Sequence, residues 1–96
     1  MADFFARVEL HRAQWPEDYK TLHDALSKHG FTNRIVSAVG EKRLPTGFYF
    51  STNRIDDVQR VAKAVKACAD STGYSSEVIV IRSAQDNPWY GFLGNV

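Results

Sequence analysis

The sequence has very little cysteine and no large excess of either charge. Cys68 is the only cysteine among 96 residues, which excludes an internal disulfide and favours a reducing compartment. The 12 basic and 11 acidic side chains leave a net charge of +1, without the basic excess of a dedicated nucleic-acid binder. Any phosphate binding must therefore depend on a local cluster of cations.

Long apolar runs are missing as well. No run approaches the roughly 20 residues that a membrane-spanning helix needs, and the opening segment MADFFARVEL lacks the layout of a signal peptide. We therefore expect a cytoplasmic protein with no membrane partner. The length and the 44% hydrophobic content predict one domain over residues 1–96 with a single modest core.

Metal-ligand spacing is a third absence. His11, His23 and His29 form no His-x-x-x-His pair, and Cys68 has no partner thiol. The sequence therefore predicts no metal site and no cofactor. His29 falls on the apolar stripe of a predicted helix and is expected to be partly buried, whereas His23 falls at the edge of that stripe and is expected at the surface.

Hydrophobic periodicity divides the chain into six regular elements and one turn. In chain order they are a strand at 3–11, a helix at 14–30, a strand at 31–39, a turn at 40–47, a short strand at 48–51, a helix at 53–73 capped by Asn53, and a strand at 75–83. This β-α-β-β-α-β order predicts an α+β, ferredoxin-like sandwich, with two helices on one face of a four-stranded antiparallel sheet. The last strand is apolar on both faces, so we expect it well inside the sheet.

The other face of that sheet would be open and apolar in a monomer, and such a patch usually meets a partner. The candidate cover is the C-terminal tail, residues 85–96. Its apolar side chains are Trp89, Tyr90, Phe92 and Leu93. The tail either folds back over its own sheet, with room for an extra C-terminal strand, or crosses to a twin chain. We favour the second arrangement, a homodimer with these four residues at its interface.

A row of polar side chains lies on the first strand, within the segment FFARVELH. Arg7, Glu9 and His11 share the face that points away from the helices, at a spacing of about 7 Å between neighbours. An imidazole moves a proton near neutral pH, and a guanidinium binds a phosphate. RNA cleavage by a 2′-hydroxyl needs both functions. The competing interpretation is the polar half of an alternating strand, or ion pairs at a dimer interface.

The turn GEKRLPTG places two cations, Lys42 and Arg43, between glycines. Phosphate contacts need only suitably placed cations, so these two residues are candidate contacts to a nucleic-acid backbone. The alternative is an ordinary charged turn in solvent.

Three segments, FFARVELH, DYKTLHDALSKHGF and LPTGFY, together resemble the GhoS-like type V antitoxins over about the first 50 residues. The resemblance implies a ferredoxin-like fold related to the CRISPR-associated Cas2 nucleases. It also implies a sequence-selective, metal-independent endoribonuclease that cuts the messenger RNA of a small membrane toxin. The near-neutral charge favours an alternative, a non-catalytic protein-binding module such as a phage- or prophage-encoded inhibitor.

Overall fold

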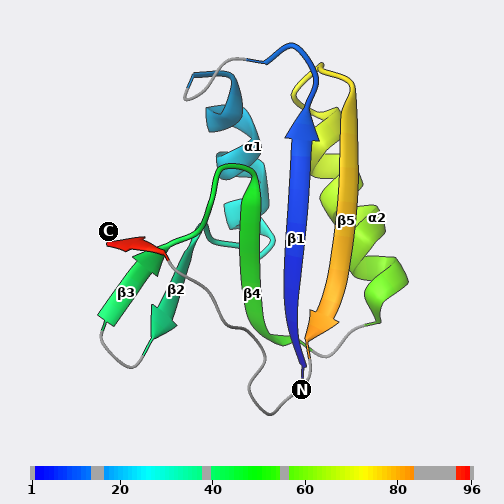
Figure 1. Cartoon of the computed structure of the whole chain (residues 1–96). Helices are drawn as coiled ribbons and strands as arrows, with labels where there is room; N and C mark the ends of the chain where they lie inside the picture. The colour runs from blue at the N-terminus through cyan, green and yellow to red at the C-terminus, as the bar shows by residue number, and fades with distance from the viewer. Residues whose placement is uncertain (1, 14–16, 38–39, 55–56, 84–92, 96) are drawn as a thin grey trace.

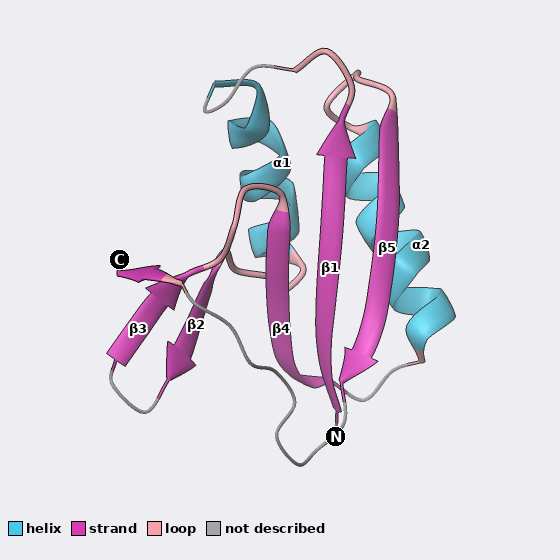
Figure 2. Cartoon of the chain, in the orientation of Figure 1, coloured by secondary structure: helices cyan, strands magenta, loops and turns pink. Residues whose placement is uncertain are grey.

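The computed structural model describes residues 2–13, 17–37, 40–54, 57–83 and 93–95 (Figure 1). These residues form a mixed α+β arrangement of two helices and two antiparallel three-stranded sheets (Figure 2). The elements are β1 (Ala2–Leu10), α1 (Glu17–Lys28), β2 (Arg34–Ser37), β3 (Gly40–Arg43), β4 (Phe48–Arg54), α2 (Val58–Asp70), β5 (Ser76–Ser83) and β6 (Gly94–Asn95).

The main sheet has the order β4-β1-β5, so β1 is its central strand, as predicted. Alternation along β1 sends one set of side chains, Phe4, Ala6, Val8 and Leu10, into the core, where each is at most 4% exposed. Both helices lie behind this sheet in Figure 1 and bury their apolar stripes against it. The core is thus a single layer between one face of the sheet and two amphipathic helices.

Each helix begins at acidic residues that stabilise its N-terminal end. In α1 the acidic Glu17 and Asp18 occupy the first turn, where they favour the positive end of the helix dipole. In α2 the Asp57 side chain caps the helix by accepting a 2.8 Å hydrogen bond from the Arg60 backbone N–H. The predicted cap at Asn53 is therefore wrong, because that residue still belongs to β4.

A second, smaller sheet of order β2-β3-β6 replaces the predicted fourth strand of the main sheet. Among the described residues, the segment that follows α1 pairs with β4 through a bridge between Thr32 and Phe50, with backbone hydrogen bonds of 2.9 and 2.8 Å. Beyond Thr32 it leaves β4 and forms the β2–β3 hairpin, which projects from the side of the main sheet in Figure 1. The prediction of a turn over 40–47 is therefore wrong for 40–43, which are strand β3.

The hairpin has apolar anchors of its own. Ile35 and Leu44 are 3% and 7% exposed, and the Leu44 N–H donates to the Asn33 carbonyl at 2.8 Å. Burial of these two side chains supplies the local reason for a separate sheet, since each contributes about 1.5–3 kcal/mol when removed from water.

Strand β5 lies at an edge of the main sheet, so its predicted place well inside a sheet is wrong. Val78 and Val80 face the helices and are half-buried, while Ile79 and Ile81 point the other way and are 59% and 53% exposed. The apolar character of both faces therefore reflects a core on one side and an exposed surface on the other.

The end of the chain supplies the extra strand that the sequence allowed, because β6 pairs with β3 of its own chain. In the predicted interface set, Trp89, Tyr90 and Phe92 lie outside the described residues. Leu93 is described and is half-buried.

Gly47 provides a direct test of this packing. Its φ is +78°, and a Cβ at this position would overlap the carbonyl oxygen of Val8 on the central strand. Gly73 has a similar φ of +84° with no atom within 4 Å of its Cβ position. We expect Gly73→Ala to cost about 1–2 kcal/mol of unfolding free energy from backbone conformation alone, and Gly47→Ala to cost about 1–3 kcal/mol more. Equal losses in urea unfolding would contradict the predicted contact with β1.

Candidate functional site

The main sheet turns one face away from the helices, and this face carries the candidate site. Its apolar part consists of Phe5 from β1, Phe48 and Phe50 from β4, and Ile79 and Ile81 from β5; we call this surface the open face. Phe5 lies directly opposite Phe50 and Ile81 in the strand pairing. The ring of Phe5 is 4.9 Å from that of Phe50 and 6.2 Å from that of Phe48, measured between centroids. The three rings therefore form one aromatic cluster.

A group of charged side chains continues the open face towards the C-terminal end of β1. Arg7 lies opposite Phe48 and Ile79, and its Nη1 is 4.0 Å from Glu9 Oε2. His11 forms a different pair, with its Nε2 3.4 Å from Glu77 Oε1. The structure thus places Arg7 beside Glu9 and His11 beside a second acid from β5, with about half of each predicted side chain exposed.

Glu77 is the residue that the sequence interpretation missed. It lies directly opposite Glu9 in the β1–β5 pairing, which only the strand register reveals. The two carboxylates and Arg7 line a shallow hollow of about 160 Å³, together with Val78 and Ile79. Because small-molecule pockets usually hold about 300–1,000 Å³, this hollow suits one group of a larger ligand and not a whole ligand.

The charged side chains at the C-terminal end of β1 can support acid–base chemistry. A carboxylate at 3.4 Å can orient the His11 imidazole, and imidazoles are common general bases in enzymes. Arg7 offers a guanidinium whose paired N–H groups match a phosphate. No group of three or more side chains suited to metal binding occurs in the described part of the chain.

Lys42 and Arg43, the predicted backbone contacts, are neighbours on strand β3. Successive strand residues point to opposite faces, so the two cations do not form one cluster. Lys42 pairs across the hairpin with the buried Ile35 and is itself half-buried, whereas Arg43 pairs with Arg34 and is exposed.

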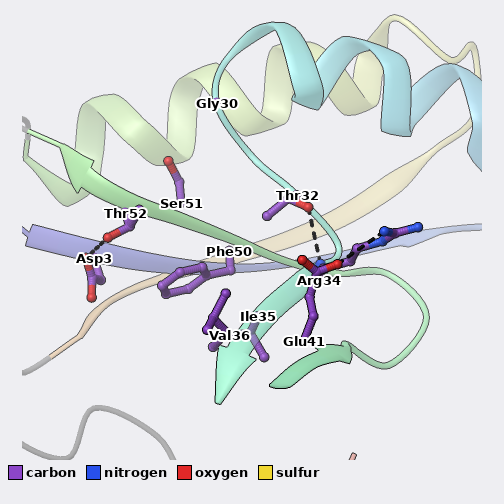
Figure 3. Close-up of a pocket in the computed structure, with 10 residues that line it drawn as sticks. All are labelled: Asp3, Gly30, Thr32, Arg34, Ile35, Val36, Glu41, Phe50, Ser51 and Thr52. Carbon is purple, nitrogen blue, oxygen red and sulfur yellow. Dashed lines mark hydrogen bonds and ion pairs between the residues drawn. The ribbon is translucent and has the colours of Figure 1, made fainter. Parts of the chain in front are cut away.

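A hollow of about 510 Å³ separates the β2–β3 hairpin from β4 (Figure 3). Asp3 and Thr52, joined by a 2.6 Å hydrogen bond, stand on one side, and the Arg34–Glu41 ion pair of 3.2 Å stands on the other. Phe50 lies between them, so this hollow adjoins the aromatic cluster. A ligand on the open face would therefore meet it at Phe50.

Two histidines occupy places opposite to those predicted. His29 is exposed, whereas His23 is half-buried and shares a 3.0 Å hydrogen bond between its Nδ1 and the Tyr49 hydroxyl. The reason is that Tyr49 points to the helix-facing side of the sheet, where α1 packs and brings His23 against its hydroxyl. Burial lowers the pKa of His23, against a smaller opposite effect of Asp24, and burial also raises the pKa of Tyr49.

No protein-family model and no curated protein matches this sequence. The function is therefore inferred from the geometry of the site. In the described residues, neither helix combines the length and the apolar character required to cross a bilayer.

The half-buried imidazole of His23 predicts a pH dependence of the free energy of unfolding. Because the pKa of His23 in the folded chain lies below its ordinary 6.5, the unfolded chain binds the proton more readily. His23 should therefore leave stability unchanged above about pH 7 and reduce it progressively as the pH falls from 6.5 towards the folded pKa. In urea unfolding, His23→Gln should flatten this decline. An identical pH slope in both proteins would contradict the burial of a neutral imidazole.

Proposed function

We propose that this chain binds single-stranded RNA on the open face and cuts it there without a metal ion. The observation that carries the proposal is the adjacency of the Phe5–Phe50 ring pair to Arg7, with the His11–Glu77 pair on the same face. Aromatic rings on an open sheet are a common platform for bases, and stacking contributes about 1–3 kcal/mol per base.

The proposed reaction is a transfer within the RNA strand. His11 takes the proton of a 2′-hydroxyl, and the 2′-oxygen attacks the adjacent phosphorus. The bond to the 5′-oxygen breaks, and that oxygen takes a proton from water, which leaves a 2′,3′-cyclic phosphate. Arg7 stabilises the negative charge that develops on the phosphate oxygens. Glu77 orients the imidazole of His11, and Glu9 orients the guanidinium of Arg7.

This activity is the one that the resemblance to GhoS-like antitoxins implies, with the messenger RNA of a small toxin as substrate. The proposal extends to the fold, which we infer to be a variant of the ferredoxin-like, Cas2-like arrangement. In that variant the second strand keeps only its bridge at Thr32, and the following residues form the β2–β3 hairpin. The order β4-β1-β5, with two helices on one face, supports this assignment.

Cleavage can be tested with the full chain and a mixed pool of transcripts in EDTA. We expect the wild-type chain to produce fragments ending in a 2′,3′-cyclic phosphate. His11→Ala should reduce the rate by about 100-fold or more, since it removes the proton acceptor, and Glu77→Gln should reduce it less. The matched control is His29→Ala, because His29 is exposed in the turn that follows α1, away from the open face.

The assay distinguishes a specific role of His11 in cleavage from a general effect of removing a histidine. Intact RNA with both the wild-type chain and His11→Ala would end the catalytic proposal. Equal loss with His11→Ala and His29→Ala would exclude a specific role for His11.

The charge of the same face favours a second function, docking of a protein and above all of a second copy. In the strand pairing, Asp3, Glu9 and Glu77 fall on this face against Arg7, a balance that disfavours phosphates. Ile79 and Ile81 are exposed on the edge strand β5, where unpaired backbone groups can pair with another chain. This second proposal includes two cases: a homodimer formed by two copies of this chain, and a prophage-encoded inhibitor that docks on another protein.

The homodimer can be tested by light scattering. We expect the wild-type chain to have the mass of a dimer and Ile81→Lys to have that of a monomer, because a charge would enter an apolar contact. Val36→Lys is the matched control, since Val36 is 75% exposed on the hairpin and lies outside the open face. A monomeric wild-type chain, or equal masses for the wild type and Ile81→Lys, would contradict docking through β5.

A further inference from the structure

The β2–β3 hairpin carries an unbalanced positive charge. Arg34 and Arg43 lie directly opposite each other in the strand pairing, an arrangement of like charges that destabilises a sheet. Glu41 offsets one of them through its 3.2 Å contact with Arg34 Nη1. Among the described residues, Arg43 has no carboxylate within ion-pair distance. Within the described part of the chain, its charge is therefore available to an anion.

The third strand of the small sheet fixes the direction of that arginine. On β6, Gly94 lies directly opposite Arg43, and a Cβ at Gly94 would be 3.5 Å from the Arg43 Nη2 atom. The guanidinium thus lies over the position where β6 has no side chain. A Cβ at that distance would make ordinary van der Waals contact with the guanidinium.

Arg43 also lines a cleft of about 270 Å³ between α1 and the turn of residues 44–47. Three further polar residues, His23, Asn33 and Thr46, also line it. No carboxylate is among its described lining residues. By contrast, the hollows at the open face and beside Phe50 each contain acidic side chains. The charge of this cleft is therefore complementary to an anion.

We propose that this cleft binds a phosphate group, with Arg43 as its charged contact and Asn33 and Thr46 as neutral hydrogen-bond donors. A guanidinium matches a phosphate through two parallel N–H···O bonds, and neutral donors complete such a site without repelling the anion. The volume suits a phosphate with part of the molecule that carries it. The cleft is formed by α1, β3 and the turn before β4, so it is separate from the open face and does not depend on RNA cleavage there.

The site can be tested by titrating the ¹⁵N-labelled full chain with pyrophosphate at low salt and constant pH. We expect the amide resonances of Asn33, Arg43 and Thr46 to shift, and Arg43→Gln to weaken binding at least tenfold. Lys42→Gln is the matched control, because it removes the same charge from the adjacent residue, whose side chain points to the other face of the hairpin. It should bind pyrophosphate within about twofold of the wild type.

Absence of shifts at these residues would overturn the site, as would equal weakening by Arg43→Gln and Lys42→Gln. A second titration, with a short single-stranded oligoribonucleotide, identifies the source of the phosphate. Competition with pyrophosphate assigns the cleft to an RNA backbone, and lack of competition assigns it to a small phosphorylated ligand; each outcome retains the phosphate site. A chain that binds pyrophosphate through Arg43 but leaves RNA intact would support this inference and contradict the cleavage proposal.

Discussion

The burial of one face of β1 is the constraint on which the rest of the molecule depends. Phe4, Ala6 and Val8 are at most 1% exposed because two helices cover them, and the two-residue period of a strand then directs Phe5, Arg7 and Glu9 to the opposite face. A shift of one residue in register would reverse both sets. The energy that holds the core together therefore also fixes the relative positions of the aromatic cluster and the charged groups.

The second organising feature is the departure of the chain from β4 after the Thr32–Phe50 bridge. A complete fourth strand would extend the sheet along the edge of β4. The hairpin instead leaves a large hollow beside Phe50, and its strand β3 carries Arg43 to a cleft lined by His23 of α1. One change in strand pairing thus accounts for both the hollow beside Phe50 and the cleft that Arg43 lines.

Local patterns in the sequence predict the central strand, the two helices and the polar row on β1, because each depends on periodicity along one segment. The misplaced features depend on partners elsewhere in the chain. Apolar residues on both faces of β5 predict a strand well inside the sheet, but the pattern cannot show that β5 is an edge strand with Ile79 and Ile81 exposed. Glu77 joins the site only through the register of β5 against β1. His23 is half-buried because it packs against Tyr49 of β4, a contact that no local pattern indicates.

The central claim is that the open face, with its rings and Arg7, is the surface that contacts RNA. Chemical-shift mapping of the full chain with a single-stranded, 2′-deoxy-substituted oligoribonucleotide tests it most directly, because such a strand is bound without being cut. The account predicts that the largest shifts occur at Phe5, Arg7 and Phe50, and that the ring resonances move upfield through base stacking. Shifts confined to the helices, or no shifts at all, would contradict it.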